Sequence, residues 1–249
     1  MDSSPDAVLL RSPDDDGPDR YVAALGDAGL EAVCEPVLAF SFPRPAALRD
    51  RLASPDRYAG LIATSPRAAT ALARLASDQS PLLQAWGERP AYAVGPKTAD
   101  QLRALGLHPR GAEAGSAEAL AAYIVDDAPA APLLFLSGNR RRDTLPEALQ
   151  RAGLPFDELV VYETHPRSDL DLPAANGSTW LVFFSPSGLE AVEAGEGADL
   201  EEYRVAAIGP TTGTALATAG FSVEAVAESP SPEGLVAALK TAGAASSGR

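Results

Sequence analysis

The sequence is short of the residues that build metal sites and disulfides. Its 249 residues include one cysteine and two histidines. One cysteine cannot form an internal disulfide, and neither histidine has a partner at the spacing of a zinc site. The lone thiol, Cys34, lies in the apolar stretch EAVCEPVLAF, so we expect it to be buried and unreactive. We therefore expect no bound metal.

Long apolar runs and the common cofactor motifs are also missing. No stretch approaches the roughly 18 consecutive apolar residues of a membrane span. The segment MDSSPDAVLL has neither the basic start nor the apolar core of a secretory signal. There is no G-x-S-x-G elbow, no Walker loop and no G-x-G-x-x-G fingerprint. These absences disfavour serine hydrolases, nucleoside triphosphatases and dinucleotide enzymes, and they predict a cytoplasmic protein with no membrane partner.

Positive charge is scarce. The chain carries 20 lysines and arginines against 34 acidic residues, which gives a formal net charge of −14, and only Lys97 and Lys240 are lysines. A surface of this sign repels phosphates, so we expect no nucleic-acid partner. Adaptation to high salt, in which self-repulsion is screened, is a hypothesis for the acidic excess.

What the chain does contain is a repeated alternation of short apolar runs and helical patterns. Continuous apolar runs are typical of strands that are covered on both faces. Leucines at helical spacing follow most of them, as in the pairs Leu72 and Leu75 or Leu102 and Leu105. Strand, turn and helix in repetition predict an α/β fold with parallel sheets. The predicted strands lie within 7–12, 60–66, 91–96, 132–139, 180–186 and 204–210.

The alternation is itself repeated. AYAVGPKTADQL resembles VAAIGPTTGTAL, LIATSPRAATAL resembles VFFSPSGLEAV, and GSAEALAAYI resembles PSPEGLVAAL, in the same order. This pattern predicts two similar halves. Two β-rich stretches that end on proline, EPVLAFSFP and ELVVYETHP, are the expected crossings between them. We therefore predict one domain from 1–38 with 168–249, a second from 44–160, and connecting strands at 39–43 and 161–167.

Hydroxyl groups and glycines gather at the predicted strand-to-helix turns. In a parallel sheet these turns share the carboxyl edge, where ligands of open α/β sheets bind. Free N–H groups and the helix dipole make each turn an anion site, although each is also an ordinary capped helix start. Taken together, the turns favour a cleft between two domains that binds a polyanion. The candidate binding residues are Thr64, Ser65, Gly95, Thr98, Ser137, Gly138, Asn139, Ser185, Ser187, Gly209, Thr211 and Thr212.

Two further features carry candidate chemistry. The run SGNRRRD places three arginines in a predicted first helical turn, where cations are unfavourable to the dipole. Anion binding, with Arg142 as the candidate, and a solvated surface run both explain this choice. Tyr162 lies in the second crossing strand, where half-buried packing is one explanation. A tyrosine hydroxyl is also protonated at neutral pH, so Tyr162 is a candidate proton donor.

In this order and spacing, the motifs LIATSPRA, AVGPKTADQL, LLFLSGN, VVYETHP, FFSPSGLEA and AIGPTTGTAL resemble the uroporphyrinogen-III synthase family. The resemblance extends over nearly the whole chain. It implies two flavodoxin-like domains joined by a two-stranded antiparallel connection, with the active site in the cleft between them. It also implies the reaction, in which hydroxymethylbilane, a linear tetrapyrrole with eight carboxylates, loses water and closes to uroporphyrinogen III with inversion of ring D.

The resemblance further implies roles for individual residues. It places the family's tyrosine at Tyr162, as donor to the leaving hydroxyl, and the threonines of its two Gly-Pro turns at Thr98 and Thr212. It implies no metal or organic cofactor. We expect a monomer in which single substitutions reduce the activity without abolishing it. The alternative is a two-domain protein that binds a polyanionic ligand and does not convert it.

Overall fold

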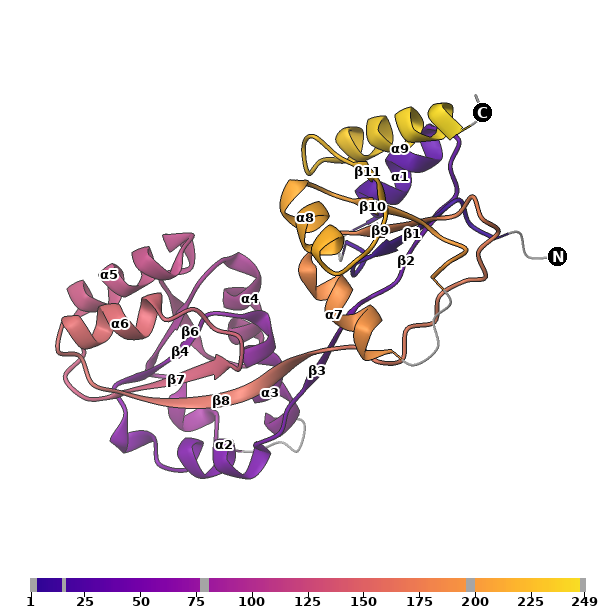
Figure 1. The fold of residues 1–249 in the computed structure, drawn as a ribbon. Coiled ribbons are helices and arrows are strands. Elements are labelled where there is room, and N and C mark those ends of the chain that lie inside the picture. The colour runs from indigo at the N-terminus through magenta and orange to yellow at the C-terminus, as the bar shows by residue number, and fades with distance from the viewer. Residues whose placement is uncertain (1–3, 15–16, 77–80, 196–199, 247–249) are drawn as a thin grey trace. The chain divides into compact units, whose positions relative to one another are not determined.

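A computed structural model of the chain describes residues 4–14, 17–76, 81–195 and 200–246. The chain divides into two compact units (Figure 1). The first unit comprises Met1–Ala39 and His165–Arg249, and the second comprises Phe40–Thr164. The first unit is therefore built from both ends of the chain, and the second is continuous.

The first unit is a parallel sheet with helices on both faces. Its strands follow the order β11-β10-β9-β1-β2. Helices α1 and α9 pack on one face, where Leu25 and Leu235 are buried, and α7 and α8 cover the other, where Val192 and Leu216 are buried. The elements are β1 (Ala7–Leu10), α1 (Arg20–Asp27), β2 (Ala32–Cys34), β9 (Trp180–Phe183), α7 (Pro186–Ala194), β10 (Arg204–Ala207), α8 (Pro210–Thr218), β11 (Val223–Val226) and α9 (Pro232–Ser246).

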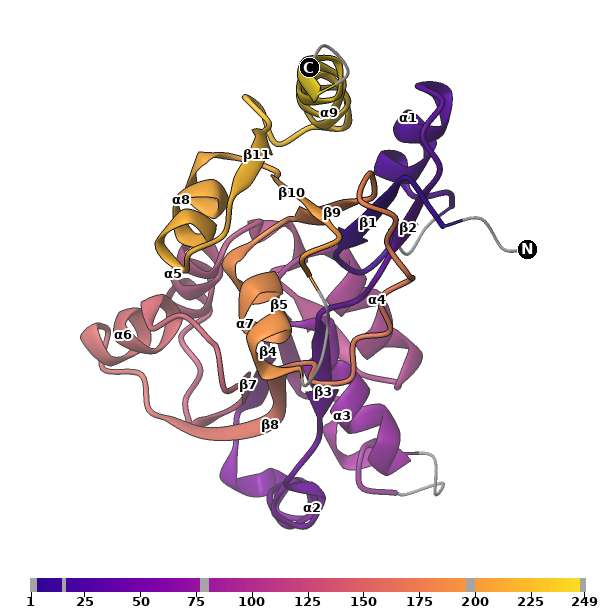
Figure 2. The ribbon, with the colours of Figure 1, turned by 45° about the vertical axis from the view of Figure 1, so that its right-hand side comes forward.

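The second unit has the same kind of architecture. Its sheet has the order β3-β8-β7-β4-β5-β6, and the strands from β8 to β6 are parallel. Helices α2, α3 and α4 supply one buried cluster, whereas α5 and α6, side by side in Figures 1 and 2, supply the other. The elements are β3 (Leu38–Ser41), α2 (Pro45–Leu52), β4 (Gly60–Ala63), α3 (Pro66–Ala76), β5 (Pro90–Ala93), α4 (Pro96–Ala104), β6 (His108–Arg110), α5 (Ala117–Asp127), β7 (Leu133–Gly138), α6 (Thr144–Arg151) and β8 (Phe156–Pro166), with 3-10 turns at Pro55–Arg57, Gln84–Trp86 and Ala112–Ala114.

The two sheets share one strand order when the sequence repeat is applied. The repeat makes β4 equivalent to β9 and β5 to β10, and neighbouring positions then pair β6 with β11, β7 with β1 and β8 with β2. With these equivalences, β8-β7-β4-β5-β6 reads as β2-β1-β9-β10-β11. The second unit is therefore a circularly permuted copy of the first, and the predicted repeat agrees with the strand order.

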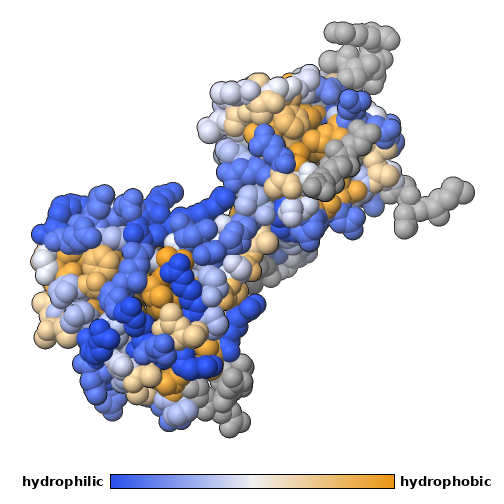
Figure 3. Space-filling view, turned by 60° about the horizontal axis from the view of Figure 1, so that its bottom comes forward, coloured by the Kyte–Doolittle hydropathy of each residue, from blue (hydrophilic) through white to orange (hydrophobic). Residues whose placement is uncertain are grey.

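The prediction of an α/β fold with parallel sheets is confirmed. The apolar runs form strands because both of their faces are covered, and every residue of β1, β4 and β9 is buried. On the face shown in Figure 3, hydrophilic residues cover much of each unit, with smaller apolar areas among them. Within the described residues, no helix combines the length and the apolar composition of a membrane span.

Candidate functional site

The predicted turns lie at the carboxyl edges of the two sheets. In doubly wound sheets a ligand binds at that edge, where the strand order reverses. The order reverses between β7 and β4 in the second unit and between β1 and β9 in the first. Thr64 and Ser65 follow β4, Gly138 ends β7, and Ser185 follows β9. Four of the predicted residues therefore lie at the reversal points.

At these edges α4, α7 and α8 begin without a side-chain cap. Helix α6 also begins without one, but its N-cap residue Asp143 places a carboxylate there. The N-cap residues of α4, α7 and α8 are Gly95, Ser185 and Gly209, and none of them accepts a capping hydrogen bond in its side chain. The Ser185 hydroxyl instead pairs with the Ser187 hydroxyl at 2.7 Å. These three helix starts therefore offer backbone N–H groups to an anion.

Other helix starts are closed by their own side chains. Asp19 caps α1, Ser116 caps α5, and the Ser65 hydroxyl accepts from the Arg67 amide at 3.3 Å. The helix that begins after Ser65 therefore has an ordinary capped start, which was the alternative explanation of this turn. The contrast separates α4, α7 and α8 as the more open anion sites.

The two threonines of the Gly-Pro turns differ from the expectation. Thr98 and Thr212 are only 2 % and 5 % exposed, because each lies on the inner side of the first turn of α4 or α8. The two side chains are therefore more buried than the sequence suggested. Thr211, beside Thr212, is exposed and offers its hydroxyl instead.

An irregularity in β8 determines the direction of the Tyr162 side chain. Ser137 pairs with Val160 and Gly138 pairs with Tyr162, so Val161 has no partner on β7 in this register. Such a bulge turns two successive side chains towards one face of the sheet. Val161 is buried among the helices α2 and α3, and Tyr162 packs against the same cluster.

Gly138 makes room for the Tyr162 ring. A Cβ atom on Gly138 would lie 2.3 Å from Tyr162 Cζ and 2.6 Å from Tyr162 Oη, closer than nonbonded atoms approach. The glycine is therefore required by space, because its φ is not in the positive range. The half-buried Tyr162 side chain lies over the carboxyl end of β7, beside the reversal point of the sheet.

The two neighbours of Gly138 differ from the expectation in different ways. Ser137 lies inside β7 rather than in the turn, and it is 1 % exposed. Asn139 follows β7, but its side chain is bound to backbone: Oδ1 accepts from the Thr164 amide at 2.8 Å, and Nδ2 donates to the Thr164 carbonyl at 3.3 Å. Ser137 points inwards because side chains alternate along a strand. The polar atoms of the Asn139 side chain are taken up by hydrogen bonds to the backbone of β8.

The arginine run precedes the helix. Because α6 begins at Thr144, the expectation that these arginines lie in the first helical turn is wrong, and the dipole argument does not apply to them. Arg141 pairs with both Glu158 and Asp143. Arg142 is exposed, and its charge adds to the hydrogen bonds from backbone and Ser116 that lower the pKa of Glu118.

The pairing of Arg141 with Glu158 is charged at neutral pH. Burial alone would raise the pKa of the Glu158 carboxyl, but the Arg141 guanidinium and the Ser137 hydroxyl outweigh burial and lower it. The Ser137 hydroxyl acts from nearby without a hydrogen bond of normal geometry. A lowered carboxyl pKa stabilises the fold above the carboxyl's ordinary pKa, and this contribution is lost only as the pH falls below it.

The comparisons with known proteins identify the family. The family model described as "Uroporphyrinogen-III synthase HemD" matches residues 19–237. The chain belongs to the uroporphyrinogen-III synthase family. Uroporphyrinogen-III synthase of Schizosaccharomyces pombe is 31 % identical over 235 residues, which cover 89 % of this chain and 91 % of the relative. The Saccharomyces cerevisiae uroporphyrinogen-III synthase is 34 % identical over 172 residues, or 60 % of this chain and 62 % of that protein.

A solved structure shares the fold. The crystal structure of uroporphyrinogen-III synthetase from Helicobacter pylori 26695 has a TM-score of 0.57 and 22 % identity, and the match covers 94 % of this chain and 98 % of that one. Membership of the uroporphyrinogen-III synthase family makes the chain an enzyme of porphyrin and heme biosynthesis, as predicted. It disfavours the alternative of a binding protein without activity.

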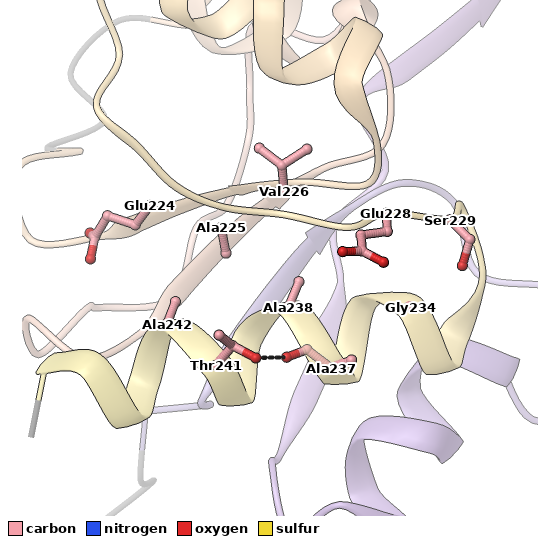
Figure 4. Close-up of a pocket in the computed structure, with 10 residues that line it drawn as sticks. All are labelled: Glu224, Ala225, Val226, Glu228, Ser229, Gly234, Ala237, Ala238, Thr241 and Ala242. Atoms are coloured by element: carbon pink, nitrogen blue, oxygen red, sulfur yellow. Dashed lines mark hydrogen bonds between the residues drawn. The ribbon is translucent and has the colours of Figure 1, made fainter.

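A cavity of about 590 Å³ between β11 and α9 is unsuited to the substrate of a uroporphyrinogen-III synthase (Figure 4). Glu224 and Glu228 lie along it, with Ala237 and Ala238 of α9 on the opposite side. Carboxylates would repel a polyanion, and none of the predicted binding residues lines this cavity. The carboxyl-edge turns remain the candidate site.

Arg11 is a charged residue at the carboxyl edge that the sequence analysis did not single out. It follows β1 directly, forms ion pairs with Asp14 and Asp19 at 2.7 Å each, and lies 5.3 Å from the Phe184 ring centroid. The only signal in the sequence is an arginine at the end of the apolar run VLL. Its carboxylate partners are set by the fold.

Among the described residues, no group of three or more histidine, cysteine or acidic side chains could hold a metal ion.

Cys34 is half-buried on β2 rather than fully buried as expected. Burial and the nearby Asp19 carboxylate raise the pKa of its thiol to about 11, despite the opposing charge of Arg11. We predict that iodoacetamide labels the native protein at pH 8 roughly a hundredfold more slowly than it labels the urea-unfolded chain, because only the thiolate reacts. Equal labelling rates in the two states would contradict this prediction.

Proposed function

We propose that this uroporphyrinogen-III synthase binds the carboxylates of hydroxymethylbilane at the carboxyl-edge turns of both units. The observation that carries the proposal is the set of uncapped helix starts at Gly95, Ser185 and Gly209, which lie at the carboxyl edges of the two sheets. Tyr162 lies at the carboxyl edge of the second unit's sheet, as Gly95 does. Backbone N–H groups bind carboxylates without any added cationic side chain. The contacting residues are Thr64, Ser65, Gly95, Ser185, Ser187, Gly209 and Thr211, with Arg142 as an exposed cation, while Thr98 and Thr212 shape their turns from within.

The two units act as two flavodoxin-like domains. The order β2-β1-β9-β10-β11 is that of flavodoxin-like sheets, and the permuted order of the second unit supports the same assignment. The connection is the pair of strands β3 and β8, which are neighbours in one sheet and run antiparallel in this proposal. The proposed domain limits are 1–38 with 168–249 for one domain and 44–160 for the other, with connecting strands at 39–43 and 161–167. The enzyme works as a monomer in the cytoplasm.

Tyr162 donates a proton to the departing hydroxyl of the substrate. The C–O bond of the hydroxymethyl group breaks, water leaves, and the pyrrole nitrogen stabilises the resulting azafulvenium cation. Ring closure follows, with loss of a proton, and general-acid assistance of this kind contributes about 10²–10⁴-fold in rate. Because free hydroxymethylbilane also closes without inversion, the domains must hold the conformer that inverts ring D, and positioning supplies that selection.

The test is a coupled assay that generates hydroxymethylbilane and separates the oxidised products by isomer. We expect mainly type III product, and we expect the rate to respond to salt, because the acidic surface is screened as salt rises. The assay is run at low and high salt, with a no-enzyme control for spontaneous closure. Type I product alone, at the spontaneous rate and at both salt concentrations, would overturn the proposed function.

A further inference from the structure

The turn that joins β7 to α6 is bonded to β8 on both sides of the bulge in that strand. The Asn139 amide donates to the Tyr162 carbonyl at 3.3 Å. The Asn139 side chain forms two hydrogen bonds with the backbone of Thr164 and so continues the strand pairing past the end of β7. Gly138 lies beneath the Tyr162 ring. Three hydrogen bonds from Asn139 and the contact of Gly138 with the ring therefore fix the β8 segment that carries Tyr162.

A second attachment lies before the bulge. The Arg141 guanidinium is bidentate on Glu158, with Nη2 donating to Oε2 at 2.9 Å and Nε donating to Oε1. Arg141 also binds Asp143 next to the start of α6. Planar bidentate pairs fix direction as well as distance. The turn is thus anchored to β8 at Glu158 and at Thr164, and Tyr162 lies between the two anchors.

We propose that Asn139 and Arg141 are positioning residues that hold the bulge of β8, and with it the Tyr162 hydroxyl, in the orientation needed for proton donation. They do so without contacting the substrate. This inference rests on the proposed function of Tyr162, and it replaces the expectation that Asn139 binds substrate. A bulge costs pairing on β7, so residues that restore the pairing beyond it determine which way the bulged side chains point.

The test is a double-mutant cycle between Asn139→Ala and Tyr162→Phe, measured as kcat for type III product. In the wild-type background we expect Asn139→Ala to lower kcat about tenfold with little change in KM. In the Tyr162→Phe background, where no hydroxyl remains to be positioned, the same change should cost about twofold or less. Asn139→Asp, which keeps the acceptor for the Thr164 amide, should recover part of kcat. Arg141→Ala should lower kcat as Asn139→Ala does, and Arg141→Lys, which keeps the positive charge, should recover part of kcat.

The matched control is Asn176→Ala, which removes a loop asparagine whose Oδ1 also accepts from backbone, at the Ser178 amide, ahead of β9. We expect it to leave kcat and the isomer ratio unchanged. Equal losses from Asn139→Ala in both backgrounds, or a loss expressed in KM, would overturn the positioning role. If wild type makes type III product but Tyr162→Phe retains full kcat, the role of Tyr162 fails. If wild type makes none, the proposed function itself fails.

Discussion

Replacing Gly138 by alanine should lower kcat for uroporphyrinogen III by one to two orders of magnitude. The new methyl group would lie 2.3 Å from Tyr162 Cζ and 2.5 Å from Tyr162 Cε2, so the ring must move. The clashing atoms form the end of the ring that carries the hydroxyl, so the hydroxyl itself is displaced. A displacement of about 1 Å from the productive geometry can cost about a hundredfold in rate.

The glycine variant is measured by steady-state kinetics with isomer analysis, alongside its thermal unfolding. Gly26→Ala in α1 is the matched control, because a Cβ there meets no atom within 4 Å and alanine is the better helix former. We expect the control to keep full activity and to gain slightly in Tm. In the double variant Gly138→Ala with Tyr162→Ala the clash disappears, so Tm should recover while kcat stays low. An unchanged kcat in Gly138→Ala would show that the ring position is unimportant.

Trp86→Ala should give the largest loss of stability, about 3–5 kcal/mol in the unfolding free energy of the second unit. Trp86 is 0 % exposed, and its ring stacks on Tyr58 with centroids 5.9 Å apart. Its indole Nε1 donates to the Leu52 carbonyl at 3.0 Å. The substitution therefore opens a cavity in the cluster formed by α2, α3 and α4 and also leaves a buried carbonyl without its donor.

The loss is measured by urea unfolding followed by circular dichroism, with Trp86→Phe as the conservative comparison. Phenylalanine keeps most of the packing but not the donor, so we expect its cost to be smaller, about 1–3 kcal/mol. The fluorescence of Trp180, the other tryptophan of the chain, then reports the first unit alone in both variants. A loss below about 1 kcal/mol in Trp86→Ala would contradict the structural role assigned to this side chain.

Local pattern predicted the elements and the sheet edge well. The apolar runs are the strands because a strand covered on both faces must be apolar throughout, and this requirement is visible within four residues, as in β4 and β9. The Gly-Pro turns are helix starts because proline suits the first helical turn. Parallel strands then bring the turns to one edge without any further information.

Side-chain exposure was less predictable. Thr98 and Thr212 look equivalent to Thr64 and Thr211 in the sequence, but burial depends on which side of the helix packs on the sheet. Ser137 is buried because β7 extends through Gly138, two residues beyond the apolar run LLFL. The prediction that the arginine run lies in a first helical turn was wrong for a related reason. The residues after β7 make contacts with β8 before the helix begins.

The sequence by itself determined the α/β class, the internal repeat and the edge on which the candidate residues lie, since each follows from local periodicity and residue order. The enzyme family was recognised by the resemblance of its motifs to that family. Only the tertiary structure decided which hydroxyls face outwards, that Val161 is bulged and that Gly138 makes space for Tyr162. Arg141 finds Glu158 seventeen residues away, on a neighbouring strand. Such contacts depend on strand register and on packing between segments that are distant in the chain, and no local pattern records them.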